Sequence, residues 1–258
     1  MKKLLSIIVT IVIMIAVLVG CTDPTVTQTD PFAKDSNATN PEVVLDGYKT
    51  DDLWSSDDRV EVDFATSHVT IVMRTEAIYL FFEVKDITPY KYVGTGDQDE
   101  VNRSDSIEFY FDTKLSRASA PSANCYQINL GRDGRTRIMS GNGGVWRSWL
   151  ALYSFEVREG VSAAEYDYYY VEAMIPAAQM NITPGSAIGI AFGQVDRNAD
   201  VNVDLEKYFT WTGLTHNGVF IEPQSPAEYL VISPVSLVEG TSNRVYTYDE
   251  YLSLTALD

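Results

Sequence analysis

Acidic side chains gather in two segments of the chain, where they could bind a metal ion. In the segment 196–204, an oxygen-bearing side chain recurs at every second position: Asp196, Asn198, Asp200, Asn202 and Asp204. This alternation is typical of the first half of a calcium loop, but Val201 occupies the position where an EF-hand has glycine, and Lys207 that of its bidentate glutamate. The pattern therefore predicts an irregular calcium site, with a solvated turn as the alternative.

The other acidic segment, residues 97–100, reads Asp-Gln-Asp-Glu and precedes Asp105 by a few positions. Calcium accepts irregular sets of about six to eight oxygen ligands, so Asp97 and Asp99 are candidate ligands as well. Structural calcium is thus the cofactor that the sequence suggests. A solvated loop is again the alternative.

Aromatic side chains in the predicted loops could bind a sugar. A sugar ring presents a flat C–H face that stacks on an aromatic ring, while polar side chains bind the hydroxyls at its rim. Tyr90 and Tyr92 lie in a polar loop, and Trp146 and Trp149 follow a glycine-rich turn at 141–144. These four residues are the candidate ligand-binding residues. Core packing is an equal alternative for Trp146 and is favoured for Trp149, which leads directly into a predicted strand.

Common catalytic motifs are absent from the sequence. His68 and His216 are the two histidines, and neither has a partner at the spacing of a metal site. No serine lies in a G-x-S-x-G elbow, and no phosphate-binding loop is present. A glycosidase, however, needs only two carboxylates that face each other across a cleft. We therefore predict a protein that is not an enzyme, with a glycosidase as the alternative.

Short strands must position these loops. In residues 77–86, every second residue is apolar: Ile78, Leu80, Phe82 and Val84. The segment that ends at Asp112 repeats this alternation. A period of two is typical of a pleated strand. Further strands are expected at 60–64, 69–74, 125–130, 135–140, 150–158, 166–175, 187–195 and 228–232. We predict an all-β fold, a single jelly-roll-type β-sandwich of about ten strands.

Local signals add detail to this fold. Trp54 follows an Asp-Gly turn and is expected to pack on the sandwich. Residues 176–180 begin with proline and predict one helical turn. Thr247 and Glu250 have the spacing of a capping box, which predicts a short helix. Cys125 lies in a predicted strand and is expected to be a small buried residue rather than a nucleophile.

The N-terminus is typical of a bacterial lipoprotein signal peptide. Lys2 and Lys3 precede an apolar run that ends in Leu18-Val19-Gly20-Cys21, the pattern of a lipobox. We expect residues 1–20 to be removed and Cys21 to be lipidated, with an uncleaved membrane anchor as the alternative. In both cases the rest of the chain is expected outside the cytoplasm.

The net charge of the chain argues against two classes of partner, and its composition indicates where the folded domain begins and ends. The net charge is −17, and removal of residues 1–20, which hold two lysines and no acids, makes it −19. Nucleic acids and anionic membranes bind basic surfaces, so neither is an expected partner. Residues 21–41 are polar and are expected to be a disordered tether. The folded domain is expected at 42–235, followed by a C-terminal extension at 236–258.

Several short motifs, in their order along the chain, resemble the family 9 carbohydrate-binding modules and their DOMON-like relatives. The motifs are Asp46-Gly47 with Asp51 and Trp54, Tyr79-Leu80 through Asp86, Asp105-Ser106-Ile107-Glu108 with Asp112, Glu172 to Pro176, Gly185 with Gly189 to Asp196, and Trp211-Thr212-Gly213. Together they cover about residues 43–232. The resemblance implies a jelly-roll sandwich, a carbohydrate ligand and structural calcium, with framework roles for Trp54 and Trp211.

The family also suggests how a sugar would be held. In its sugar-binding members, two loop aromatics enclose a terminal sugar, and Trp146 and Tyr92 are the candidates for this pair. The resulting hypothesis is a non-catalytic domain, lipid-anchored at the cell surface or the periplasmic face of a bacterial membrane, that binds a poly- or oligosaccharide. Family members are usually joined to glycosidases, so surface glycosidases are possible protein partners. A glycan-degrading enzyme and a structural lipoprotein without a sugar ligand are the alternatives.

Overall fold

The computed structural model describes residues 43–64, 66–86, 89–93, 101, 103–149, 154–160, 167–197, 206–209, 215–217, 225–234 and 245–256. The predicted signal peptide, Cys21 and the tether lie outside these residues. So do Trp211 and four of the candidate calcium ligands: Asp97, Asp99, Asn198 and Asp200. Within the described part of the chain, no helix is long and apolar enough to cross a membrane.

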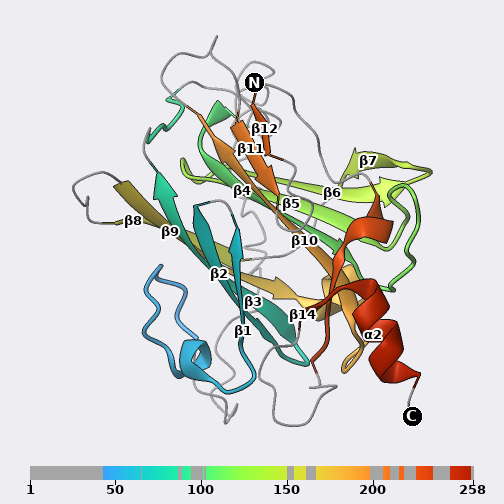
Figure 1. Ribbon diagram of the computed structural model, residues 1–258. Coiled ribbons are helices and arrows are strands. Elements are labelled where there is room, and N and C mark those ends of the chain that lie inside the picture. The colour runs from blue at the N-terminus through green and yellow to red at the C-terminus, as the bar shows by residue number, and fades with distance from the viewer. Residues whose placement is uncertain are drawn as a thin grey trace, which may run out of the picture. The chain divides into compact units, whose positions relative to one another are not determined.

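Two antiparallel sheets make up the fold (Figure 1). The smaller sheet has five strands, in the spatial order β1 (Val60–Phe64), β2 (Ser67–Met73), β3 (Ala77–Asp86), β9 (Asp167–Pro176) and β8 (Ser154–Glu159). The prediction of an all-β sandwich is confirmed.

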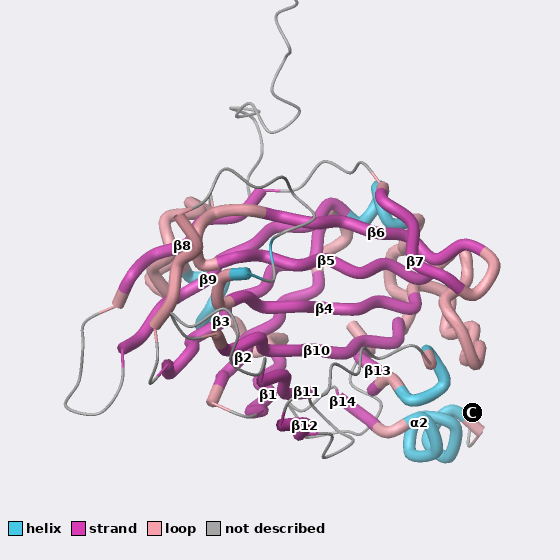
Figure 2. Tube along the Cα trace, turned by 90° about the horizontal axis from the view of Figure 1, so that it is seen from above, coloured by secondary structure: helices cyan, strands magenta, loops and turns pink. Residues whose placement is uncertain are grey.

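The larger sheet has nine strands. Seven follow the spatial order β12 (Thr215–Asn217), β11 (Glu206–Phe209), β10 (Ile188–Asp196), β4 (Ser106–Asp112), β5 (Cys125–Gly131), β6 (Thr136–Asn142) and β7 (Val145–Ser148). β13 (Leu230–Ile232) also pairs with β10, and β14 (Val245–Tyr246) pairs with β13. Figure 2 shows β10, β4, β5 and β6 side by side, so β4 and β5 occupy the middle of this sheet.

The core lies between the two sheets, because alternate residues of each strand point inward. Phe82 of β3 stacks on Phe109 of β4, with 5.7 Å between ring centres, and meets Phe192 of β10 edge-on at 5.9 Å. Phe64 of β1 stacks on Phe192 from the side of the smaller sheet, at 5.8 Å. These aromatic contacts join the sheets and leave the opposite face of each free to carry other side chains.

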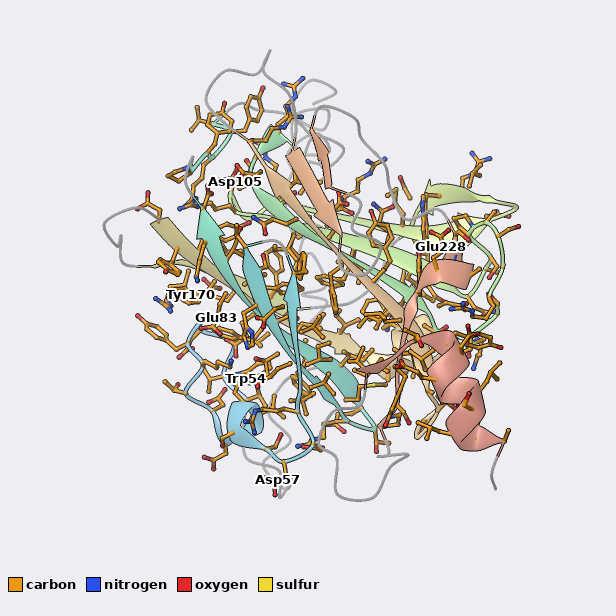
Figure 3. All side chains as sticks on the ribbon, in the orientation of Figure 1. Trp54, Asp57, Glu83, Asp105, Tyr170 and Glu228 are labelled. Atoms are coloured by element: carbon orange, nitrogen blue, oxygen red, sulfur yellow. The ribbon has the colours of Figure 1, made fainter. Side chains whose placement is uncertain are left out.

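The segment before β1 is fastened to the outer face of the smaller sheet by Glu172 of β9. This buried carboxylate accepts hydrogen bonds from the backbone N–H groups of Asp46 and Gly47, at 2.9 and 2.8 Å, and from Nε1 of Trp54 at 3.0 Å. Trp54, in the 3₁₀ turn η1 (Asp52–Ser55), is 3% exposed and meets Phe81 edge-on at 5.4 Å (Figure 3). The predicted packing of Trp54 is confirmed.

Most predicted elements are confirmed, and the strand at 60–64 has the predicted bounds. The helical turn after Pro176 is η3 (Ala177–Met180). The C-terminal helix is α2 (Tyr248–Thr255), and Thr247 and Glu250 form the capping box. Cys125 is completely buried, and this burial raises the pKa of its thiol.

The structure has fourteen strands, whereas about ten were expected. β7 was missed because Gly143 and Gly144 were interpreted as an interruption. Both have positive φ values, +62° and +89°, and form the two-residue turn of a β6–β7 hairpin. β11, β12 and β14 are too short to show a period of two. The strand predicted at 228–232 begins at Leu230, because Pro226–Glu228 form the 3₁₀ turn η4.

Candidate functional site

Two buried aspartates and one arginine form a hydrogen-bonded cluster at the rim of the sandwich, where β3 ends and β4 begins. Asp86, Asp105 and Arg132 are 3%, 1% and 5% exposed. Nη1 of Arg132 donates to Oδ2 of Asp86 at 2.8 Å and to Oδ2 of Asp105 at 3.3 Å. Asp105 also accepts the backbone N–H groups of Tyr90 and Arg197, at 2.6 and 2.9 Å. The backbone at Tyr90 is therefore tied to a buried charge cluster.

The protonation state of this cluster follows from its burial. Burial, together with the hydrogen bond and the negative charge of Asp86, raises the pKa of Asp105 to about 8. The two backbone N–H donors oppose this shift and do not cancel it. Asp105 thus carries a proton at neutral pH. The negative charge of Asp86 then balances the positive charge of Arg132. The cluster has a structural role, because its groups bind one another.

Tyr92 is held by two arginines at the same rim. The guanidinium of Arg103 lies 4.9 Å from the centre of the tyrosine ring, and its Nη1 donates to the ring hydroxyl at 2.7 Å. The guanidinium of Arg135 lies 5.0 Å from the same ring centre. A sugar would have to compete with these cations for the ring of Tyr92.

Polar residues occupy the middle of the outer face of the larger sheet. Glu108 and Tyr110 of β4 and Gln127 and Asn129 of β5 alternate with core residues, and each is 0% exposed. We call these four residues the polar face. The hydroxyl of Tyr110 donates to Oε2 of Glu108 at 2.7 Å, and Nδ2 of Asn129 donates to Oε1 of Glu108 at 2.8 Å. Nε2 of Gln127 donates to the Tyr110 hydroxyl at 3.1 Å. Glu108 is therefore the final acceptor of the network.

Trp146 forms the accessible margin of the polar face. It lies opposite Gly141 in the β6–β7 hairpin, and its ring centre is 5.9 Å from that of Tyr110. Tyr110 in turn lies 6.4 Å from the ring of Tyr229. Trp146 is half-buried, whereas its neighbour Val145 is exposed. The indole therefore packs on the polar face from the solvent side.

Two polar atoms of this region lack hydrogen bonds. Nε1 of Trp146 and Oε1 of Gln127 are buried, and neither has a hydrogen-bond partner among the described residues. A buried polar atom without a partner costs about 1–3 kcal/mol, so a bound group that pairs with it stabilises the protein. The region thus combines an aromatic ring with one buried donor and one buried acceptor that no described residue pairs with.

The structure separates two of the predicted ligand-binding residues. The carbonyl of Tyr92 accepts Nη2 of Arg135 at 3.4 Å, directly before β6 begins, whereas Trp146 pairs with Gly141 near the end of β6. Six steps along the chain separate Arg135 from Gly141, which corresponds to about 20 Å of strand. Trp146 and Tyr92 therefore lie toward opposite ends of β6, and their role as a pair around one sugar stays a prediction.

The remaining predicted residues lie at other positions. Trp149 packs at the edge of the core, with its ring centre 4.8 Å from that of Tyr126. Asp196 ends β10, where its backbone is in register with Glu206 of β11. Among the residues that the structure describes, no group of three or more His, Cys, Asp or Glu side chains could hold a metal ion.

The sequence reasoning missed the polar face. The sequence analysis assigned no role to Gln127 and Asn129, and it treated Glu108 only as part of a strand motif. The signal that could have revealed them is their position on two strands that are neighbours along the chain. Two polar residues at alternate positions of each strand face one another once the strands pair, as Glu108 and Asn129 do.

Comparison with known proteins places these features in context. The model of a family described as carbohydrate family 9 binding domain-like matches residues 45–226. A family 9 carbohydrate-binding module from Caldicellulosiruptor kristjanssonii in complex with cellotriose has 15% sequence identity and a TM-score of 0.54, covering 74% of this chain and 89% of that one. A module from the same organism in complex with glucose has 16% identity and a TM-score of 0.51, covering 74% and 91%. No curated protein matches the chain. The two solved structures share the fold described above.

Proposed function

The chain belongs to the carbohydrate family 9 binding domain-like proteins, and we propose that it binds carbohydrate at the polar face, with Trp146 as the stacking ring. The observation that carries this proposal is the network of Glu108, Tyr110, Gln127 and Asn129 beside a half-buried indole. Sugar hydroxyls both donate and accept hydrogen bonds, which suits a polar region, and the half-buried ring of Trp146 is a part of this region that solvent reaches. The likeness to modules whose structures hold cellotriose and glucose supports a glycan as the ligand.

Replacement of Trp146 by alanine is expected to weaken glycan binding at the polar face roughly fivefold or more. One stacked aromatic ring contributes roughly 1–3 kcal/mol by the apolar area it buries, and about 1.4 kcal/mol corresponds to a factor of ten. The measurement is affinity electrophoresis of the full-length chain in gels that contain different soluble polysaccharides. Retardation by one glycan class, reduced in the variant, is the expected result.

Two further variants make this test specific. Trp146→Phe keeps an aromatic ring and should retain most of the retardation. Val145→Ala changes an exposed neighbour on the same strand and should behave as the unaltered protein does. Equal retardation of Trp146→Ala and Val145→Ala would show that the sugar binds elsewhere.

We further propose that the protein is a non-catalytic, lipid-anchored binding module. The lipobox at residues 18–21 supports attachment through Cys21 to a bacterial membrane, with the domain outside the cytoplasm. Surface glycosidases are the proposed partners, since a binding module increases the local concentration of an enzyme on its substrate. If the Cys21→Ser variant still incorporates a labelled fatty acid, lipidation at Cys21 is wrong. If the protein alone hydrolyses a glycan, the non-catalytic role is wrong.

Calcium is the proposed structural cofactor, on the evidence of the two acidic segments. Candidate ligands are Asp196, Asn198 and Asp200 in one segment and Asp97 and Asp99 in the other. Binding of calcium to the folded state alone would raise the melting temperature. Millimolar calcium is therefore expected to raise it and EDTA to reverse the rise, with a smaller effect in Asp200→Asn. A melt that is identical in calcium and in EDTA would exclude both sites.

A further inference from the structure

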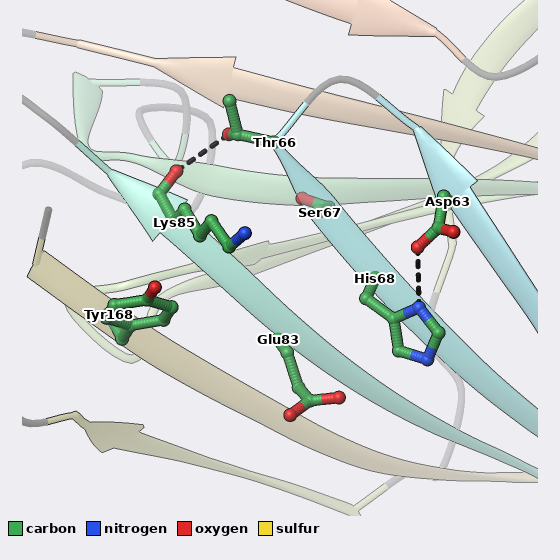
Figure 4. Close-up of a pocket in the computed structure, with 7 residues that line it drawn as sticks. All are labelled: Asp63, Thr66, Ser67, His68, Glu83, Lys85 and Tyr168. Carbon is green, nitrogen blue, oxygen red and sulfur yellow. Dashed lines mark hydrogen bonds and ion pairs between the residues drawn. The ribbon is translucent and has the colours of Figure 1, made fainter.

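A groove crosses the outer face of the smaller sheet, on the opposite side of the sandwich from the polar face (Figure 4). Its volume is about 440 Å³, which lies within the range of roughly 300–1,000 Å³ that is typical of small-molecule sites. Four strands contribute to it: Asp63 comes from β1, His68 from β2, Glu83 and Lys85 from β3, and Tyr168 from β9. We define these five residues as the sheet groove.

The strand register places hydrogen-bonding side chains next to each other along this groove. Asp63 lies opposite His68, His68 opposite Glu83, and Glu83 opposite Tyr170 on four successive strands. Nδ1 of His68 lies 2.6 Å from Oδ1 of Asp63, and Nζ of Lys49 lies 3.2 Å from Oε2 of Glu83. Asp63 is thus paired with an imidazole and Glu83 with an ammonium group, yet each carboxylate retains lone pairs for further hydrogen bonds.

Lys85 and Tyr168 form the other side of the groove. They are register partners on β3 and β9, with Lys85 exposed and Tyr168 half-buried. Thr66 fixes the backbone here, since its hydroxyl donates to the Lys85 carbonyl at 2.7 Å. Among the described residues, no carboxylate forms an ion pair with the ammonium of Lys85. The groove therefore presents a tyrosine ring beside an ammonium group with three available donors.

We propose that the sheet groove is a second carbohydrate site, for a neutral sugar unit of a polysaccharide. This inference rests on the proposed function and extends it to a second face of the molecule. A sugar without net charge fits a lining in which donors and acceptors alternate: hydroxyls donate to Asp63 and Glu83 and accept from Lys85, while the C–H face of the sugar covers Tyr168. An acidic glycan fits less well, because two carboxylates line the groove and the chain carries a net charge of −17.

Two sites on opposite faces give one molecule two points of attachment. Binding of two segments of one glycan raises the apparent affinity by orders of magnitude if the glycan can reach both sites. Binding of two separate glycans joins them. A monomeric protein with this arrangement is expected to make a solution of a long neutral polysaccharide turbid, whereas a protein with one site is not.

The test uses full-length variants in gels that contain a neutral soluble polysaccharide. In Trp146→Ala the polar-face site is weakened, so the residual retardation reports on the sheet groove. Adding Tyr168→Ala or Lys85→Gln to that variant is expected to reduce the residual binding tenfold or more, and either groove change alone should abolish the turbidity. Tyr251→Ala, on α2, is the matched tyrosine control and should change neither readout. Thermal melting verifies that each variant is folded.

The outcomes separate the groove from the proposed function. If Trp146→Ala alone removes all binding, or if the groove changes leave the residual binding intact, the second site is wrong and the polar-face proposal stands. If the unaltered protein is retarded by no glycan, both fail together. Retardation that is confined to anionic glycans and disappears in salt would overturn the neutral-sugar assignment.

Discussion

Replacement of Glu172 by alanine is expected to lower the free energy of unfolding by roughly 3–5 kcal/mol. The carboxylate accepts the backbone N–H groups of Asp46 and Gly47 and the indole N–H of Trp54, and it is 0% exposed. Its removal leaves three donors without an acceptor and a cavity under Trp54. Burial raises the pKa of Glu172, and the same three hydrogen bonds oppose that shift, which indicates how strongly they favour the carboxylate. Urea denaturation measures the loss.

Two variants control for the change of charge. Glu156 is exposed and lies opposite Glu172 in β8, so Glu156→Ala removes a carboxylate from the same sheet and should cost less than about 0.5 kcal/mol. Glu172→Gln keeps one acceptor oxygen but turns an amide N–H₂ toward a donor, and an intermediate loss is expected. If Glu172→Ala and Glu156→Ala have equal stability, Glu172 does not anchor the N-terminal segment.

Asp86→Asn is expected to make the protein more stable at alkaline pH and to flatten its pH dependence. The folded-state pKa of Asp105, about 8, lies above the ordinary value of 3.8 for an aspartate. The protonated acid therefore stabilises the fold fully below pH ~4, and this contribution is lost as the pH rises through ~8. Asparagine at position 86 removes the neighbouring negative charge and supplies an N–H that donates to Asp105. Asp105 can then ionise beside Arg132 without loss of stability.

The measurement compares melting curves of the two proteins from pH 4 to pH 9. The difference in stability should be small at pH 4 and should grow to about 2 kcal/mol or more in favour of Asp86→Asn at pH 8. Asp105→Asn is the contrasting variant. Each oxygen of Asp105 accepts a backbone N–H group. The amide nitrogen of an asparagine would face one of these N–H groups, donor against donor, so this variant should be less stable at every pH. If the difference in stability between Asp86→Asn and the unaltered protein does not change with pH, Asp105 does not carry a proton at neutral pH.

The sequence predicts the strands well because their signal is local. Ile107, Phe109 and Phe111 alternate with other side chains, and the strand that this alternation predicts is β4. Trp54 was placed correctly for a similar reason, since an Asp-Gly turn before an aromatic residue directs it back onto a sheet. Short strands such as β12 depend on a partner strand and have no pattern of their own.

The candidate site is harder to predict because it depends on pairing between strands. Nothing next to Glu108 in sequence shows that Asn129 lies opposite it, and only the register of β4 and β5 joins them. The separation of Trp146 from Tyr92 has the same origin. Both residues follow loops that look equivalent in the sequence, but the direction of β6 places the loops at opposite ends of the sheet.

The hydrogen-bond network of Glu108 also gives the outer face a fixed polarity. The Tyr110 hydroxyl has a single proton, which it gives to Glu108, so it meets Gln127 as an acceptor and holds the nitrogen of that amide toward itself. A flipped amide would set one oxygen against another. Oε1 of Gln127 must therefore point away from the network. Any group that pairs with this buried oxygen has to be a donor, so the network fixes which kind of hydrogen bond the buried side of the polar face can still form.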